Sequence, residues 1–135
     1  MFLRNCWYVA AWASEVADAP FARTICGEPV LMFRGPDARA VALEDRCCHR
    51  TAALSRGYYE DGALVCGYHG WTYDRSGRVL RIPQMERAAP ESARVHSFLA
   101  EERYGYAWVC LHDSPLLGVP EIAEWNDPVF RRIPE

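Results

Sequence analysis

Short runs of hydrophobic residues, separated by turn-forming residues, dominate this chain of 135 residues. Apolar and polar positions alternate within several runs, which is typical of strands with one buried face. Clusters of Gly, Pro, Asp and Ser mark the ends of the runs, and the turn at Gly27–Pro29 is expected to keep Pro29 out of the next strand. An aromatic-rich strand is also expected near the N-terminus, with a single helical turn within 12–17. The further predicted strands cover 21–26, 30–34, 40–44, 63–66, 71–74, 79–82, 95–104 and 106–112. The pattern therefore predicts an all-β fold.

The pattern changes at Asp113, where strand-like alternation stops. Prolines follow at positions 115, 120, 128 and 134 and interrupt every possible element. We therefore expect a domain over 1–112 and an extended arm over 113–135. Because Ile122, Trp125 and Phe130 have little to bury against within the arm, an extended arm is predicted to expose them and to promote self-association.

Composition narrows the functional class. Half of the residues are hydrophobic and 24% are charged, which suits one globular domain. The net charge is −3 and all 15 basic residues are Arg, so nothing favours binding to nucleic acid or to an anionic membrane. No apolar run approaches the roughly 20 residues of a membrane span. We expect a cytoplasmic protein, in which the six cysteines serve a metal or catalysis rather than disulfides.

Two short motifs carry the candidate chemistry. Cys47 and His49 form a C-x-H motif, and Cys66 and His69 form a C-x-x-H motif, with residues 50–65 between them. Together the two loops offer two sulfur and two nitrogen donors. A structural zinc ion with Cys2His2 ligands fits this set, as does a [2Fe–2S] cluster of the Rieske kind, in which one iron takes two Cys and the other takes two His. One Cys and one His in each loop favours the cluster, because zinc usually takes two closely spaced Cys from one loop.

The residues around both motifs resemble those of Rieske non-haem iron oxygenases. The resemblance covers Arg46–Arg50 and Cys66–Asp74, and the opening residues Asn5–Trp12 are similar to the branch that contains vanillate and dicamba O-demethylases and related aromatic-ring hydroxylases. Shorter similar segments are found at 27–30, 52–55, 81–83 and 106–109. The resemblance implies stacked antiparallel sheets with a small cluster-binding part around 45–74. It also implies a [2Fe–2S] cluster, with Cys47 and Cys66 on one iron and His49 and His69 on the other.

The same resemblance implies electron transfer. The cluster would accept electrons from a reductase or ferredoxin and pass them to a mononuclear Fe(II) in a separate catalytic domain. Only His96 and His112 remain after the cluster takes its pair, so we expect no catalytic residue here and only the electron-transfer half. Family members form head-to-tail trimers, which makes a homo-oligomer possible. A stand-alone Rieske ferredoxin and a structural zinc domain remain the alternatives.

Three positions differ from the cytochrome bc type of Rieske protein. Ala52 and Tyr68 stand where that type has an additional disulfide, and Trp71 stands where it has a Ser that hydrogen-bonds the cluster. Fewer donors to sulfur predict a potential toward the low end of the roughly −150 to +300 mV Rieske range. Cys48, beside a predicted ligand, is expected to be a bystander.

Overall fold

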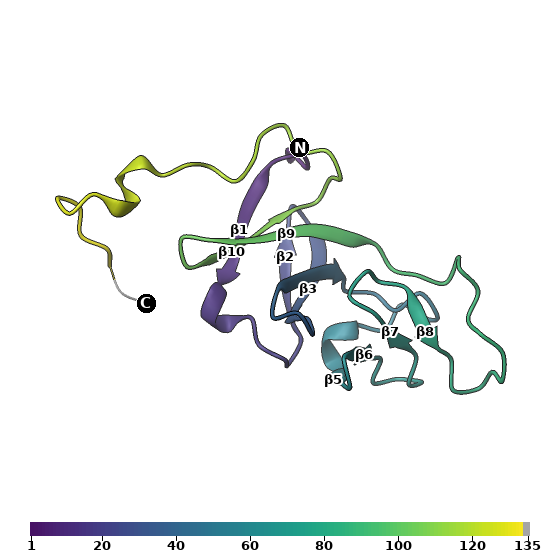
Figure 1. Ribbon diagram of the computed structural model, residues 1–135. Coiled ribbons are helices and arrows are strands. Elements are labelled where there is room, and N and C mark those ends of the chain that lie inside the picture. The colour runs from purple at the N-terminus through teal and green to yellow at the C-terminus, as the bar shows by residue number, and fades with distance from the viewer. Residues whose placement is uncertain (134–135) are drawn as a thin grey trace.

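The computed structural model describes residues 1–133, and its regular secondary structure consists almost entirely of antiparallel strands joined by loops (Figure 1). A six-stranded sheet has the order β1-β10-β9-β4-β3-β2, and a four-stranded sheet has the order β5-β6-β7-β8. The larger sheet comprises β1 (Trp7–Trp12), β2 (Phe21–Ile25), β3 (Glu28–Arg34), β4 (Ala40–Glu44), β9 (Ser97–Arg103) and β10 (Tyr106–Cys110). The smaller sheet comprises β5 (Tyr58–Glu60), β6 (Ala63–Val65), β7 (Thr72–Tyr73) and β8 (Val79–Arg81). The predicted all-β class is confirmed.

Three short 3-10 helices complete the described structure: η1 (Ala13–Glu15), η2 (Leu54–Arg56) and η3 (Ala123–Asn126). The first coincides with the helical turn predicted within 12–17. The other two were not predicted, because three or four residues are too few to produce a helical pattern, and β5 was not predicted either.

Three hairpins turn through two residues that both have positive φ angles, the second being glycine. Such type I′ turns match the right-handed twist of the flanking strands. The pairs, with their φ angles, are Cys26-Gly27 (51° and 78°), Asp61-Gly62 (49° and 81°) and Tyr104-Gly105 (59° and 77°). The turn predicted at Gly27–Pro29 is therefore wrong: it consists of Cys26 and Gly27 and ends two residues earlier than expected. Pro29 belongs to β3, opposite Thr24 of β2, because the compact turn lets the strand begin at Glu28.

Strand β3 is buried on both faces and separates two hydrophobic cores. Val30 and Met32 face a core enclosed by the curled larger sheet, whose outer strands β1 and β2 also contact each other. Leu31 and Phe33 face a second core, between the larger sheet and the smaller one. This second core contains the thiols of Cys47 and Cys66, which are both buried. The predicted ligand thiols therefore lie where the two sheets meet.

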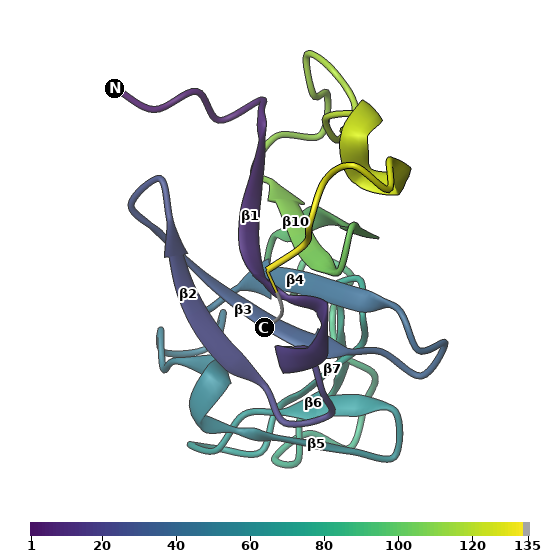
Figure 2. The ribbon, with the colours of Figure 1, turned by 90° about the vertical axis from the view of Figure 1, so that its left-hand side faces the viewer.

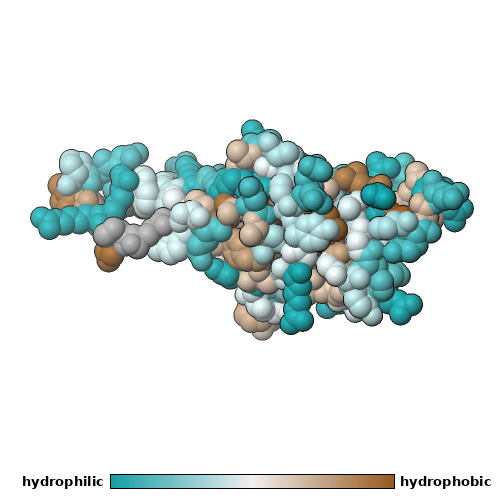
Figure 3. All heavy atoms as spheres, turned by 90° about the horizontal axis from the view of Figure 1, so that it is seen from below, coloured by the Kyte–Doolittle hydropathy of each residue, from teal (hydrophilic) through white to brown (hydrophobic). Residues whose placement is uncertain are grey.

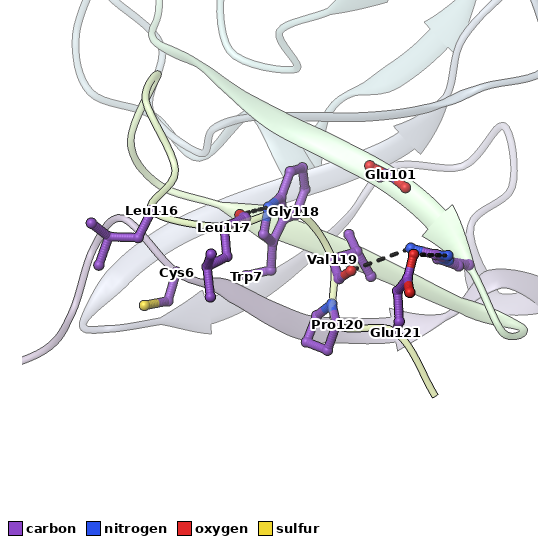
Figure 4. A pocket seen from close by; sticks show the side chains of 10 residues that line it. Cys6, Trp7, Glu101, Leu116, Leu117, Gly118, Val119, Pro120 and Glu121 are labelled. Carbon is purple, nitrogen blue, oxygen red and sulfur yellow. Dashed lines mark hydrogen bonds and ion pairs between the residues drawn. The ribbon is translucent and has the colours of Figure 1, made fainter. Parts of the chain in front are cut away.

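The first part of the arm packs along the edge strand β1. The backbone N–H of Leu116 donates to the carbonyl of Asn5 at 2.9 Å, and the indole N–H of Trp7 donates to the carbonyl of Leu117 at 3.0 Å. Val119 is buried. A cavity of about 570 Å³ lies between this segment, β1 and β9, and none of its lining residues belongs to the predicted cluster loops (Figure 4).

From Ile122 on, the arm lies beyond the turn between β9 and β10 in Figure 1 and in front of the sheets in Figure 2. It curls around a hollow of about 740 Å³ that it lines together with Trp12 and Tyr104–Tyr106. Trp125 still packs against Tyr104, with ring centroids 4.9 Å apart, but Val129 and Phe130 are exposed. Hydrophobic surface is visible at this end of the molecule (Figure 3). Of the three apolar residues singled out in the sequence, Trp125 is thus partly covered, whereas Ile122 and Phe130 are exposed. Residues 134 and 135 of the predicted arm lie outside the described residues.

Within residues 1–133, no helix has the length and hydrophobicity to cross a membrane.

Candidate metal centre

The two predicted ligand loops close with the same backbone hydrogen bonds. In the first, the N–H of Cys47 donates to the carbonyl of Ala52 at 2.8 Å, and the N–H of Thr51 donates back to the carbonyl of Cys47 at 2.8 Å. In the second, the N–H of Cys66 donates to Trp71 at 2.8 Å, and the N–H of Gly70 donates to Cys66 at 3.0 Å. The fifth residue of each loop, Thr51 or Gly70, has a positive φ angle. Each Cys therefore sits at the start of a matched turn, with its His two or three residues further on.

The two thiols lie together at the base of these loops. Cys47 and Cys66 are each 2% exposed, and neither is in a disulfide. Burial raises the pKa of the Cys66 thiol, and its contact with the Cys47 thiol raises it further, whereas the backbone N–H groups of Tyr68 and His69 lower it. Those N–H groups point at the sulfur and would stabilise a thiolate there.

The two imidazoles lie together nearer the surface. The ring centroids of His49 and His69 are 4.9 Å apart, and the ring of His49 stacks on Trp71 at 4.5 Å with an angle of 9° between the planes. Partial desolvation lowers the pKa of His49, and the nearby His69 and the Arg50 cation lower it further. The His49 ring is thus favoured in the neutral form that binds metal ions.

One ring nitrogen of this pair has no partner. Nδ1 of His69 is buried and accepts or donates no hydrogen bond among the described residues. Leaving a buried polar atom unpaired costs about 1–3 kcal/mol. A bond from this nitrogen to a metal ion would remove that cost.

The four donors form two pairs rather than one ring around a single point. Thiol lies beside thiol and imidazole beside imidazole. Within the part of the chain that the structure describes, no three His, Cys, Asp or Glu side chains are placed to hold one ion. Two irons, each with its own pair of ligands, match the paired arrangement.

Comparison with known families agrees with this geometry. Residues 6–100 match the sequence profile of the Rieske [2Fe-2S] domain, which covers most of the chain and both motifs. This chain belongs to the Rieske domain family. The cofactor of that family is the [2Fe–2S] cluster.

Curated relatives of this Rieske domain are components of oxygenase systems. The chain is 43% identical to the vanillate O-demethylase oxygenase subunit of Pseudomonas sp. (strain HR199), over 94% of this chain and 36% of the relative. It is 41% identical to the toluene-4-sulfonate monooxygenase iron-sulfur subunit of Comamonas testosteroni, over 99% of this chain and 40% of the relative. The resemblance to the demethylase branch is confirmed, and the chain spans about two fifths of the length of these relatives.

Solved structures give the same result. The crystal structure of apo dicamba monooxygenase superposes with a TM-score of 0.86 at 38% identity, covering 96% of this chain and 41% of that one. The dicamba O-demethylase oxygenase component of Stenotrophomonas maltophilia is likewise 38% identical, over 98% of this chain and 40% of the relative. Sequence similarity and structural similarity thus assign the same family and fold to this chain.

The residues present fit a [2Fe–2S] cluster. Two buried thiols, two adjacent imidazoles and the unpaired Nδ1 of His69 provide the sulfur and nitrogen donors that such a cluster requires. Trp71 and Tyr68 flank the imidazoles, the latter with its ring 3.9 Å from that of His69. These aromatic rings shield the donors from water on two sides.

Sequence reasoning missed one residue of this centre, Tyr73. Its ring is fully buried, and its hydroxyl lies 3.0 Å from the sulfur of Cys47 and 3.2 Å from the backbone nitrogen of Cys48. Burial raises the pKa of Tyr73, and the Cys47 and Cys48 thiols raise it further, so the phenol stays protonated and can donate. Tyr73 occupies a predicted strand, where an aromatic residue is ordinarily a packing residue, so no local pattern marks it.

A second missed feature connects the two loops. The carboxylate of the buried Asp45 accepts hydrogen bonds from the backbone N–H and the hydroxyl of Ser55, at 2.7 and 2.6 Å. Ser55 belongs to η2, and Gly57, the residue that follows this helix, lies against the carbonyl of Val65, immediately before Cys66. A continuous series of contacts thus leads from the base of the first loop to the base of the second.

Proposed function

We propose that this chain is the electron-transfer domain of the oxygenase component of an aromatic-ring hydroxylating or O-demethylating system. The observation that carries the proposal is the pairing of donors on two matched loops, with one buried ring nitrogen left without a partner. Cys47 and Cys66 would hold one iron and His49 and His69 the other. A [2Fe–2S] cluster held there supplies reversible one-electron chemistry.

The positions of the four side chains indicate on which side of the cluster an electron would enter or leave. The thiols are enclosed by the core between the sheets, whereas His49 is exposed and His69 is half-buried. The imidazole side is therefore the one that a donor or acceptor can approach. The acceptor in this proposal is a mononuclear non-haem iron in a catalytic domain outside these 135 residues.

The proposed division of the chain follows from the same comparison. Residues 1–112 would form the Rieske domain, and 113–135 would form an arm leading toward the catalytic domain. The arm's initial packing on β1 and its exposed apolar groups beyond Ile122 support this, as does the greater length of the relatives. We also propose a cytoplasmic location, which the six unpaired cysteines support.

Anaerobic reconstitution with iron and sulfide tests the proposed ligands. The wild-type chain is expected to bind equal amounts of iron and inorganic sulfide and, once reduced, to give a Rieske-type electron paramagnetic resonance spectrum. Cys47→Ser and Cys66→Ser should each abolish that spectrum, whereas Cys26→Ser, a thiol outside the loops, should retain it. A colourless protein that binds only zinc would overturn the proposal in favour of a structural zinc domain.

A basic surface beside the imidazoles suits an acidic electron donor. Arg46, Arg50 and Arg56 are exposed, and none forms an ion pair or hydrogen bond through its side chain with any residue in 1–133. Arg56 lines a hollow of about 300 Å³ together with Ala52, Ala53, Gly67 and Tyr68, and Tyr68 is 63% exposed. Unpaired cations steer an acidic partner by long-range attraction, and a largely apolar hollow then offers it a contact surface. We propose that the reductase or ferredoxin docks here.

The salt dependence of reduction tests this docking surface. The rate at which a reduced [2Fe–2S] ferredoxin reduces the reconstituted chain should fall with ionic strength, and changing all three arginines to Gln should lower the rate at low salt and flatten that dependence. The matched control removes the same charge elsewhere, at Arg78, Arg94 and Arg131. Equal effects of the two triple variants would show that only net charge matters, and would exclude the surface.

A further inference from the structure

Cys48 shares a hydrogen-bonding partner with the ligand that precedes it. Its thiol sulfur lies 3.4 Å from the hydroxyl oxygen of Tyr73, and its backbone nitrogen lies 3.2 Å from the same oxygen. The sulfur of Cys47 is 3.0 Å from that oxygen on the buried side. The single hydroxyl of Tyr73 therefore has three polar neighbours, two of which belong to Cys48.

Counting protons assigns the direction of each contact. A Cys47 thiolate bound to iron has no proton, so it can only accept, and the O–H of Tyr73 must donate to it. The hydroxyl has no second proton, so its other two neighbours must donate to its lone pairs. The backbone N–H of Cys48 fills one lone pair and the S–H of Cys48 fills the other. All the hydrogen-bonding capacity of Tyr73 is then used.

We propose that Cys48 is a positioning residue that acts on the cluster through Tyr73. This inference rests on the proposed function, because it requires Cys47 to be an iron ligand. A donor to the phenol oxygen polarises its O–H bond and strengthens the hydrogen bond that the O–H makes in turn. Hydrogen bonds to a ligand sulfur favour the reduced, more negative cluster. The Cys48 thiol thus raises the reduction potential without touching the iron, and the expectation that it is a bystander is replaced by this role.

A double-mutant cycle on the reconstituted chain tests the proposal, with the midpoint potential as the readout. Cys48→Ala should lower the potential, and Cys48→Ser, which retains a donor, should recover most of the loss. Tyr73→Phe should lower it further, and adding Cys48→Ala to Tyr73→Phe should then change nothing more. Cys6→Ala, which removes a thiol outside both loops, is the matched control and should leave the potential unchanged.

The outcomes separate this proposal from the proposed function. If the wild-type chain assembles the cluster but Cys48→Ala has the wild-type potential, or if Cys48→Ala still lowers the potential when Tyr73 is Phe, the role of Cys48 is overturned and the function stands. If Cys48→Ala loses the cluster spectrum altogether, Cys48 is a ligand and the role is likewise overturned. If the wild-type chain assembles no [2Fe–2S] cluster, the proposed function fails first.

Discussion

Gly57 is the position where the addition of one methyl group should disturb the metal centre most, although no ligand is altered. It ends η2 and packs directly against the backbone of β6. A Cβ atom at this position would lie 1.9 Å from the carbonyl oxygen of Val65, where ordinary contact begins at 3.4 Å. It would also lie 3.1 Å from the carbonyl oxygen of Leu54. Both obstacles are backbone atoms, so no side-chain rotation can relieve them.

The cost can be estimated from this geometry. Forcing extra volume into a packed region costs about 1–3 kcal/mol and sometimes more, and a clash with backbone on two sides belongs at the upper end. We expect Gly57→Ala to lower the free energy of unfolding by about 3 kcal/mol, which corresponds to a fall of roughly 10 °C in Tm for a chain of this size. Because the residue after Val65 is Cys66, the variant should also separate the two thiols and take up less iron and sulfide.

Urea unfolding of the cluster-free protein, followed by tryptophan fluorescence, measures the stability, and reconstitution measures the uptake. Gly118→Ala is the matched control, because a Cβ there meets nothing within 4 Å. It should change stability by less than about 0.5 kcal/mol. A Gly57→Ala protein as stable as the control, with full cluster uptake, would refute the reasoning that this contact sets the distance between the loops.

Two further stability measurements follow from charged groups. The guanidinium of Arg34 holds the Glu102 carboxylate through two hydrogen bonds of 2.8 and 3.0 Å, and chiefly this contact lowers the pKa of Glu102 from the ordinary 4.5. The contribution of this pair to the free energy of unfolding should be complete above about pH 4.5 and be lost as the pH falls through the lowered pKa. Glu102→Gln should therefore make the free energy of unfolding less dependent on pH in the acid range, and should lower it by about 1 kcal/mol at pH 7. Asp45→Ala should cost about 2–3 kcal/mol in urea unfolding, because it removes both acceptors of Ser55, whereas Asp45→Asn, which retains one acceptor, should cost less; equal stability of the Ala and Asn variants would contradict this account.

The positions of most strands were predictable from the sequence, whereas the pairing of β1 with β10 and of β4 with β9 was not. The strands predicted over 95–104 and 106–112 are found as the antiparallel pair β9 and β10, joined at Gly105. The strand β5 was missed although Asp61-Gly62 is one of the strongest hairpin signals, because Tyr58–Glu60 lacks the aliphatic run that marks its partner Ala63–Val65. Pro29 was excluded from a strand by a rule for central strands, yet it lies in β3 between β2 and β4, at the end of the strand where the ladder begins.

The donor types of the candidate centre were also predictable, because each motif is local. Their pairing was not, because it depends on contacts between segments far apart in the chain. Nothing near Tyr73 in sequence indicates that its hydroxyl reaches Cys47, which is 26 positions away. Likewise, Asp45 has the sequence context of a turn residue, and only the fold shows that it holds Ser55. Polar contacts of this kind are set by the packing of the two sheets.

The contacts that join the two loops indicate which substitutions should most affect cluster uptake and stability. Each loop is closed by its own pair of backbone hydrogen bonds. Two sets of contacts join the loops: the Tyr73 hydroxyl reaches Cys47 and Cys48 directly, and a route from Asp45 through η2 and Gly57 leads to Val65. The second route uses a buried carboxylate and a glycine rather than any metal donor. Substitutions along that route should therefore reduce cluster uptake and the stability of the cluster-free protein together. A substitution of the exposed ligand His49, in contrast, should abolish uptake while leaving the stability of the cluster-free protein nearly unchanged.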